Sequence, residues 1–470
     1  MIEKIKIIET LNFIDKEIKL TGWVNSYRSH GKIIFFDLRD RSGLVQCVVL
    51  NSSRCFEIAE NLNLEDVIMI EGVVKKREEK MINKKIPTGE IEIVVNDIFI
   101  LSKSKPLPFP IDSDGYEISE DIRLKYRYLD LRRKRLLDNL INRHKINLFI
   151  RNWLSKKDFI EIETPILTKS TPEGARDFLV PSRLEKGKFY ALPQSPQQYK
   201  QLLMVSGIEK YFQIARCFRD EDTRGDRQPE FIQLDIEMSF VEEKDILSLI
   251  EDLIKSLIKE LYPEKFFTFN DFPHLSYQEV INKYNSDKPD LRKNKDDKNE
   301  LAFCFVVDFP YFEVLEDGTL NPMHHPFTKP KLKDGTYDKE KIIEMLNDNP
   351  LDLLSFQYDI VCNGYEIGGG SIRIIDKDVL ISVFKVLGHE ENEVYDKFGH
   401  LLEAFDYGVP PHGGIAMGLD RLIMILENEP NIREVIAFPK TGEGRDLMMG
   451  SPSEVDKNQL KELGIKIDLN

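Results

Sequence analysis

The sequence has few cysteines and no long apolar segment. Its five cysteines are scattered as Cys47, Cys55, Cys217, Cys304 and Cys362, without a CxxC pair or a paired histidine spacing. This argues against a zinc site or a disulfide framework and indicates a reducing compartment. No apolar run reaches the roughly 18 residues that a membrane span needs, and the first residues, MIEKIKIIET, have the features of neither a signal peptide nor a transit peptide. We therefore expect a cytoplasmic protein.

The chain also lacks an excess of positive charge. Its 66 basic and 81 acidic side chains give a net charge of −15, which argues against a generally basic nucleic-acid-binding protein. One local exception is the segment 123–135, RLKYRYLDLRRKR, where seven cations accompany one acid. We expect this segment to form either a basic surface that contacts RNA or a solvated linker. A length of 470 residues predicts about two to four domains.

The strongest local pattern lies between Tyr211 and Phe240. In its second half, one face of a strand would carry Ile232, Leu234, Ile236, Met238 and Phe240, and the other face Phe231, Gln233, Asp235, Glu237 and Ser239. The first face is expected to enter the core and the second to meet solvent. Residues 212–219 also have strand character, so the segment predicts an antiparallel hairpin with a charged loop from Asp220 to Glu230.

The polar face of this hairpin is a candidate nucleotide site. Arg219, Asp235 and Glu237 share that face with Phe231, an aromatic residue that a purely solvated surface does not need. Cations that clamp phosphates and a ring that stacks on a base would suit a nucleoside triphosphate. A solvated hairpin with surface ion pairs is the alternative.

Residues 1–104 predict a small β-barrel. Five short strand-like segments separated by turns favour an OB-fold. In the second of them Ile34, Phe36 and Leu38 would form the inner face, which leaves Phe35 outside. An aromatic side chain on the outer face can stack on an unpaired base, and packing beneath a neighbouring loop is the alternative.

The rest of the chain predicts a hinge and a larger domain. Residues 105–137 contain KPLPFP and the basic segment, and they are expected to form the hinge before a domain at 138–470. Apolar spacing at Ile146, Phe149, Ile150, Trp153 and Leu154 predicts a helix, and residues 242–262 predict another. The polar run 287–300, DKPDLRKNKDDKNE, predicts a solvated loop.

Four unrelated blocks follow one another along the chain. They are QSPQQYK at 194–200, FRDED with RQPEFIQLD at 218–235, GYEIGGGSIRI at 364–374 and GIAMGLDRL at 414–422. These blocks resemble the motifs of the class II aminoacyl-tRNA synthetases, and specifically the aspartyl-tRNA synthetases, over nearly the whole chain. The resemblance implies an α+β fold in which an antiparallel sheet with flanking helices follows an all-β OB-fold barrel that reads the anticodon. It also implies a homodimer and the loss, near 287–300, of the large inserted domain that bacterial relatives carry.

The resemblance also assigns functional residues. Arg219 and Arg421 would be catalytic. The aspartate-binding residues would be Glu173, Gln197, Gln198, Tyr199, Lys200, Arg219, Asp235, His324, His325 and Arg373. The ATP-binding residues would be Arg219, Asp220, Glu221, Gln228, Phe231, Glu366, Gly418, Leu419, Asp420 and Arg421. The residues that contact the tRNA anticodon would be Arg28, His30, Phe35 and Gln46.

Asp359 and Glu366 are the candidate metal ligands. They lie seven residues apart, and two carboxylates with retained waters suit Mg²⁺; unpaired exposed acids are the alternative.

The expected function is therefore that of an aspartate–tRNA ligase. It would use ATP and Mg²⁺ to form aspartyl-adenylate and transfer the aspartyl group to the 3′ end of tRNA(Asp). His30, a residue seen in relatives that also charge asparagine tRNA, would extend its range to tRNA(Asn). Lys200 and Arg373 would select the substrate by its side-chain carboxylate. The alternatives are an asparaginyl-tRNA synthetase, a tRNA-independent asparagine-forming paralogue and a catalytically inactive nucleic-acid-binding module.

Overall fold

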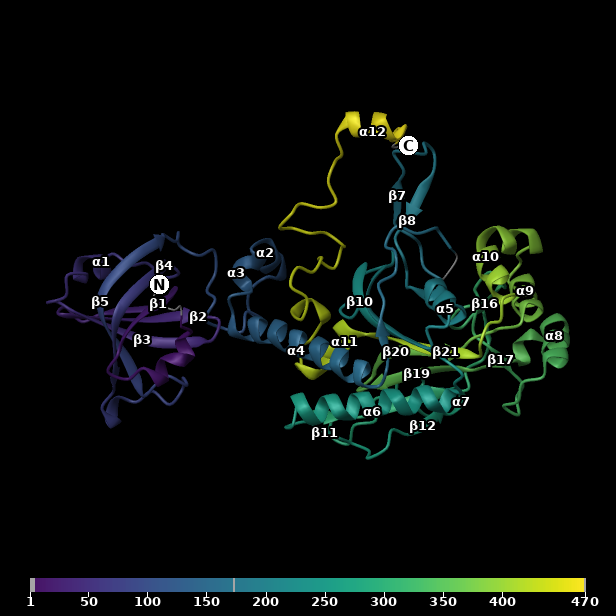
Figure 1. Cartoon of the computed structure of the whole chain (residues 1–470), viewed down its shortest axis with the longest axis horizontal. Coiled ribbons are helices and arrows are strands. Elements are labelled where there is room, and N and C mark those ends of the chain that lie inside the picture. The colour runs from purple at the N-terminus through teal and green to yellow at the C-terminus, as the bar shows by residue number, and fades with distance from the viewer. Residues whose placement is uncertain (1–4, 172–173, 469–470) are drawn as a thin grey trace. The chain divides into compact units, whose positions relative to one another are not determined.

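The computed structural model of the chain describes residues 5–171 and 174–468. The chain divides into two units, Met1–Gly115 and Tyr116–Asn470 (Figure 1). Among the described residues, no helix combines the length and the apolar character that crossing a bilayer requires.

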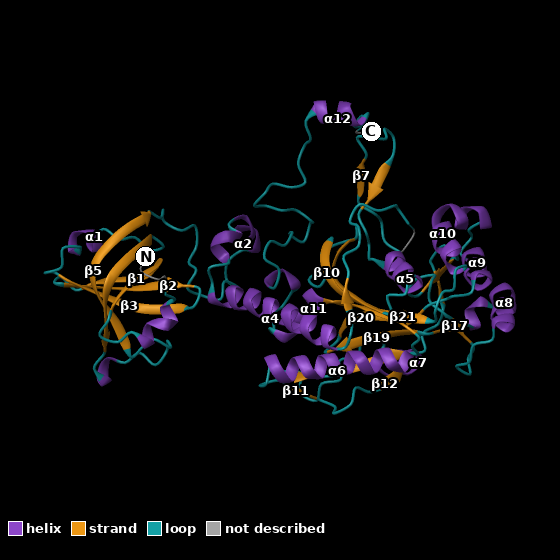
Figure 2. Cartoon of the chain, viewed as in Figure 1, coloured by secondary structure: helices purple, strands orange, loops and turns teal. Residues whose placement is uncertain are grey.

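In the first unit, alternating apolar residues close five strands into a barrel (Figure 2). The strands are β1 (Glu17–Ser29), β2 (Ile33–Asp40), β3 (Gly43–Leu50), β4 (Val67–Lys76) and β5 (Ile91–Ser102), in the order β1-β2-β3-β5-β4. Ile34, Phe36 and Leu38 are buried in the barrel core, which confirms the inner face predicted for β2. Short helices η1 (Ile7–Asn12), α1 (Phe56–Glu60) and η2 (Glu79–Met81) accompany the strands.

The second unit is built on an eight-stranded sheet. In spatial order its strands are β12 (His274–Ser276), β14 (Phe303–Val307), β19 (Gln357–Cys362), β20 (Tyr365–Ile372), β21 (His412–Gly418), β10 (Glu230–Ser239), β9 (Lys210–Phe218) and β6 (Ile160–Glu161). The central pairs are antiparallel, whereas the outermost pair at each edge is parallel. The predicted antiparallel sheet is therefore correct for the strands at its centre.

Helices cover both faces of this sheet. The longer helices of this unit are α4 (Lys134–Lys156), α5 (Gln197–Val205), α6 (Glu243–Leu261), α7 (Tyr277–Tyr284), α8 (Lys339–Asp348), α9 (Lys377–Val386), α10 (Glu391–Phe405), α11 (Leu419–Leu426) and α12 (Lys457–Leu463). Of these, α12 lies away from the sheet (Figure 1). Figure 1 shows α5 and α6 on opposite sides of the sheet. The apolar stripe of α6 and the buried Ile146, Ile150 and Leu154 of α4 share one core with the central strands, which confirms both predicted helices.

Shorter elements complete the second unit. Four two-stranded sheets pair β7 (Leu179–Pro181) with β8 (Phe189–Ala191), β11 (Phe266–Phe267) with β13 (Glu300–Leu301), β15 (Phe312–Val314) with β16 (Leu320–Pro322), and β17 (Pro330–Lys331) with β18 (Leu354–Ser355). The short helices are α2 (Glu120–Lys125), α3 (Arg127–Asp130), η3 (Pro350–Asp352) and η4 (Ile432–Glu434).

The hairpin formed by β9 and β10 confirms the predicted pairing but corrects two details. Phe240 lies beyond the end of β10, where its φ of 59° turns the chain toward α6 and its side chain is 70% exposed. The part of the polar face of β10 that carries Asp235 and Glu237 does not meet solvent, because α5 brings Lys200 against both carboxylates. Both carboxylates are 0% exposed, so the charged face is an internal layer of the protein.

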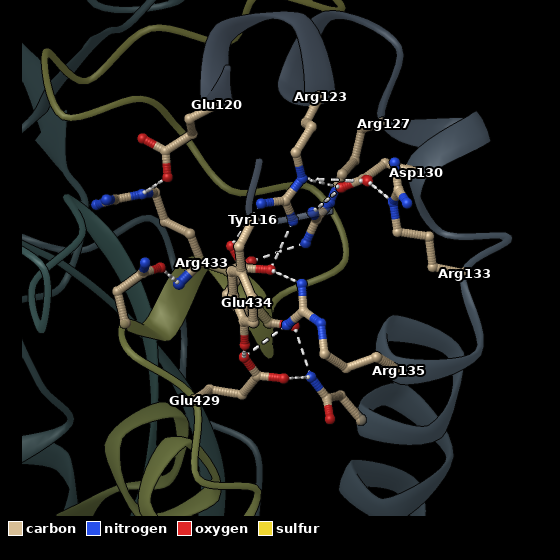
Figure 3. A network of polar contacts seen from close by, with 12 residues as sticks. Tyr116, Glu120, Arg123, Arg127, Asp130, Arg133, Arg135, Glu429, Arg433 and Glu434 are labelled. Carbon is tan, nitrogen blue, oxygen red and sulfur yellow. Dashed lines mark hydrogen bonds and ion pairs between the residues drawn. The ribbon is translucent and has the colours of Figure 1, made fainter. Parts of the chain in front are cut away.

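The basic segment also lies differently from its expected surface position. Arg123, Arg127 and Arg133 converge on the buried Asp130 with nitrogen–oxygen distances of 3.1, 2.8 and 2.7 Å (Figure 3). Arg123 also forms a bidentate pair with Glu434. The three arginines are nearly inaccessible to solvent, so they do not belong to a basic surface. Lys125 and Lys134 of the same segment are exposed, and contact of this segment with RNA stays a prediction.

Candidate active site

A polar cavity of about 310 Å³ opens between α5 and the sheet. It is lined by Gly174, Ala175, Gln194, Ser195, Gln197, Lys200, Arg219, Glu221, Gln233, Asn321, Pro322, Met323, His324, His325, Glu366, Gly369, Arg373 and Ala416. Gly369 faces it from β20, where an added Cβ would come within 2.8 Å of Asp359 Oδ1. A side chain at this position would therefore displace the Asp359 carboxylate.

Below this cavity, Lys200 and Arg373 are already paired with carboxylates. Lys200 Nζ lies 2.6 Å from Asp235 Oδ1 and 3.3 Å from Glu237 Oε2. Arg373 Nε and Nη2 donate to the two oxygens of Glu237 at 2.9 and 3.0 Å. Burial opposes the ionisation of Glu237, but the adjacent Arg373 and Lys200 lower its pKa to about 2. Burial raises the pKa of Asp235, although Lys200 acts in the opposite direction.

The two histidines of HHPFT cover the same cluster. The ring centroids of His324 and His325 are 4.2 Å apart, and Arg373 Nη1 lies 2.7 Å from His325 Nε2. Burial and the positive charges of Arg373, Lys200 and Arg219 lower the pKa of His324 to about 3. The pKa of His325 is lowered in the same way. Because Arg373 donates to Nε2 of this neutral ring, the ring proton of His325 belongs on Nδ1.

A second cavity of about 180 Å³ adjoins the first. It is lined by Arg219, Glu221, Asp226, Arg227, Gln228, Phe231, Ile232, Gln233, Glu366, Ile367, Gly368, Ala416, Gly418, Asp420, Arg421 and Ile432. The guanidinium of Arg219 lies 5.1 Å from the ring centroid of Phe231, and the buried Nε of Arg421 has no hydrogen-bond partner among the described residues. Arg219 and Glu366 line both cavities, so a ligand of one cavity would meet a ligand of the other beside them.

Some residues assigned to the ATP site are placed elsewhere or have structural partners. Asp220 is exposed and Leu419 is fully buried, and neither lines the two cavities. Asp420 accepts hydrogen bonds from the Ile232 backbone N–H and from Arg143 Nη1. Asp420 therefore holds the first turn of α11 against β10 and α4.

Helical geometry separates the residues of QSPQQYK. Gln197, Lys200, Gln201 and Met204 form the buried face of α5, and the buried Nε2 of Gln197 has no hydrogen-bond partner among the described residues. Gln198 and Tyr199 instead line a different cavity, where they contact His400 and Thr168. The structure therefore does not bring these two residues to the cavity that Lys200 lines. Glu173 lies outside the described residues.

Asp359 and Glu366 stand on the neighbouring strands β19 and β20. Burial and the nearby Glu366 raise the pKa of Asp359. Burial opposes the ionisation of Glu366, but Lys288 and Arg421 lower its pKa. In the part of the chain that the structure describes, no group of three or more His, Cys, Asp or Glu side chains could hold a metal ion. Two carboxylates fit Mg²⁺, which usually takes one or two protein carboxylates and completes its octahedron with water and phosphate oxygens.

The residues assigned to the anticodon share one outer face of the barrel. Arg28 of β1 is the cross-strand partner of Phe35 on β2. Asp37 follows Phe35 by two residues on the same face of β2, and its cross-strand partner on β3 is Gln46. The rings of His30 and Phe35 meet edge to face at 6.0 Å. Gln46 donates to Glu92 at 3.2 Å, so its amide is already oriented on this face.

Sequence reasoning missed three residues of the site. Gln233 lines both cavities from the polar face of β10. Because it alternates with Asp235 along the strand, the sequence pattern places both side chains on the same face. Asp226 pairs with Arg421 at 3.1 Å, and Lys288 pairs with Glu366 at 3.1 Å. No sequence pattern indicated the last two contacts, because each joins segments that are far apart in the chain.

Comparisons with known proteins identify both units. Residues 119–442 match the family model described as tRNA synthetases class II (D, K and N), and residues 18–101 match that of an OB-fold nucleic acid binding domain. A protein of Dictyoglomus turgidum named aspartate–tRNA(Asp/Asn) ligase is 43% identical over 579 residues, covering 97% of this chain and 96% of the relative. The protein of the same name from Chlorobaculum parvum is 41% identical over 577 residues, covering 96% and 94%. Both alignments are longer than this chain, so these relatives contain residues that it lacks.

Solved structures share the fold. The asparaginyl-tRNA synthetase of Pyrococcus horikoshii complexed with asparaginyl-adenylate superposes with a TM-score of 0.74 at 24% identity, covering 94% of this chain and 99% of that one. The aspartyl-tRNA synthetase of Entamoeba histolytica gives a TM-score of 0.71 at 24% identity, covering 93% and 91%.

Proposed function

Because the chain belongs to the class II tRNA synthetases (D, K and N), we propose a reaction for its two adjoining cavities. The protein is an aspartate–tRNA ligase. It activates L-aspartate with ATP, releases pyrophosphate and transfers the aspartyl group from the adenylate to the 3′ end of tRNA(Asp). The observation that carries this function is that Lys200 and Arg373 line the same cavity as Arg219, which also lines the second cavity.

In this proposal the two cavities hold the two substrates of the first step. ATP occupies the cavity with Phe231 and Arg421, and aspartate occupies the one with Lys200. Arg219 lies where the two meet, and its planar guanidinium can contact the α-phosphate and the attacking carboxylate together. Such a reaction requires positioning and charge neutralisation rather than a protein nucleophile. Asp359 and Glu366 would hold Mg²⁺, which would neutralise phosphate charge when bound.

The donors of Lys200 and Arg373 explain how aspartate is preferred to asparagine. Glu237, His325 and Ser371 engage four of the five N–H groups of Arg373, which leaves one on Nη2. Lys200 donates a hydrogen bond to Asp235 and forms an ion pair with Glu237, which leaves at least one of its three N–H groups. Two remaining donors match the two acceptor oxygens of a carboxylate. The side-chain amide of asparagine would present its NH₂ group to one of these two donors and leave that donor without an acceptor.

The test is aspartate-dependent pyrophosphate exchange together with the charging of purified tRNA(Asp). We expect both to require aspartate. Exchange and charging that respond to asparagine instead would identify an asparaginyl-tRNA synthetase. If the protein forms free asparagine and AMP from aspartate, ATP and ammonia without charging tRNA, it is the asparagine-forming paralogue. No exchange at all would leave a nucleic-acid-binding module.

We also propose that the protein charges tRNA(Asn), as the names of its relatives indicate for them. His30 is exposed beside Phe35 on the barrel face assigned to the anticodon. We expect His30→Leu to lower charging of tRNA(Asn) about tenfold or more, the size of one lost base contact, while charging of tRNA(Asp) changes little. Charging assays with both purified tRNAs measure this. If neither the native protein nor the variant charges tRNA(Asn), the dual range is wrong.

We propose further that the protein acts in the cytoplasm as a homodimer. The strand β6 lies at an edge of the main sheet, next to α4, and its Ile160 is 51% exposed. An exposed apolar edge favours association with another chain. We expect light scattering to give twice the mass of one chain and Ile160→Asp to shift the population toward monomer. A native mass of one chain at micromolar concentration would contradict the proposal.

A further inference from the structure

One loop of the second unit holds a residue of the proposed metal site. Lys288 Nζ lies 3.1 Å from Glu366 Oε2, and each side chain is about one-third exposed. Glu366 lines both substrate cavities, whereas Lys288 is outside the set of described residues that line them. The ammonium group therefore contacts this carboxylate without lining either cavity itself.

The loop that carries Lys288 is partly exposed, as the sequence predicts for 287–300, and its polar groups also bond to one another. Asp290 and Arg292 form a bidentate pair with distances of 3.0 and 2.8 Å. The carboxylate of Glu300 accepts the backbone N–H groups of Lys293 and Asn294, both at 2.8 Å. These contacts hold the loop in one conformation around Lys288.

The same loop packs against the turn between β19 and β20. A Cβ added to Gly364, in that turn, would lie 3.6 Å from the Cβ of Asp290. Asn363 of the turn accepts the Ala302 N–H at 2.9 Å and donates to the Glu300 carbonyl at 3.0 Å. The turn therefore joins the loop to the two strands that carry Asp359 and Glu366, and it keeps the backbone of the loop beside these strands.

We propose that Lys288 is a positioning residue for the magnesium site. Its contact with Oε2 restricts the rotation of the Glu366 carboxylate, so that the other oxygen faces the cavity on the side of Asp359. This inference rests on the proposed function, because it takes Asp359 and Glu366 as the ligands of the metal that accompanies ATP. A residue that orients a metal ligand commonly changes metal affinity by about 10- to 100-fold when it is removed.

The experiment measures magnesium affinity without catalysis. A non-hydrolysable ATP analogue is titrated by calorimetry into the full chain over a series of magnesium chloride concentrations, with Lys288→Met, Lys288→Arg and the control Lys295→Met. Lys295 belongs to the same loop, is 67% exposed and lies 3.8 Å from Asp290. For Lys288→Met we expect the half-saturating magnesium concentration to rise about 10- to 100-fold, with an unchanged melting temperature and unchanged analogue binding in a chelator. Lys288→Arg should recover most of the loss, and Lys295→Met should match the native protein.

Two results would overturn the inference while leaving the proposed function intact. If Lys288→Met needs no more magnesium than Lys295→Met, the contact is an ordinary surface ion pair. If it needs less, Lys288 competes with the metal instead of positioning its ligand. A native protein whose analogue binding ignores magnesium would overturn the metal assignment itself, and this inference with it.

Discussion

Replacing Arg373 with leucine is expected to abolish aspartate activation and also to lower the free energy of unfolding by about 3–5 kcal/mol. The first effect follows from the loss of one of the two donors available to the substrate carboxylate. The second follows because Glu237, 0% exposed, would keep only its contact with Lys200 at 3.3 Å. The sequence alone predicts the loss of activity with an intact fold. The buried ion pair changes that expectation to a destabilised protein.

A double variant separates these two effects. In Arg373→Met combined with Glu237→Gln, neither partner is left as an unpaired buried charge, so most of the stability should return. Aspartate-dependent pyrophosphate exchange should remain lost. Urea unfolding and exchange assays on the single and double variants measure both quantities. An unchanged specificity constant for aspartate in Arg373→Leu would show that the carboxylate pocket lies elsewhere.

Replacing Arg219 with alanine is expected to slow aspartate activation about 10²- to 10³-fold, the usual effect of removing one group that stabilises developing charge. Arg219 is only partly buried and lies over the ring of Phe231, so the free energy of unfolding should change by no more than about 0.5 kcal/mol. Single-turnover formation of aspartyl-adenylate measures this rate. The rate of Arg219→Lys should fall between those of the native protein and Arg219→Ala, because an ammonium group cannot hold two oxygens in the same plane.

Arg216→Ala is the matched control for this experiment. Arg216 is on β9, three residues before Arg219, and its side chain is 63% exposed and pairs with Glu230. We expect this variant to form adenylate at the native rate. Equal losses in the two variants would show that general positive charge near the hairpin, rather than the position of Arg219, supports the reaction.

The sequence predicts the local elements well because their signals are periodic. Alternation identifies β2 and β10, and the spacing of Ile146, Ile150 and Leu154 identifies α4. The same alternation does not reveal that the polar face of β10 is buried. That depends on Lys200, which comes from another element and neutralises Asp235 across 35 residues of sequence.

The errors within the candidate site have a similar cause. The contiguous block places Gln198 and Tyr199 with Gln197, but a helix turns their side chains about 100° and 200° away from that of Gln197. The polar sequence around Lys288 does not reveal that groups of this loop bond to one another and to Glu300. In both cases the position of the side chains depends on contacts with residues elsewhere in the fold, and a local sequence pattern does not reveal these contacts.

The arginine cluster around Asp130 has a consequence for how the protein is made. Arg123 and Arg127 find partners at Glu434 and at the carbonyls of residues 433, 436 and 437, more than 300 positions later in the chain (Figure 3). During translation, at about 5–20 residues per second, the ribosome must therefore add those positions before α2 and α3 can reach their final packing. Until then Asp130 is the acid that the structure pairs with these arginines, and a product that terminates before Glu434 would lack the second carboxylate of the cluster permanently.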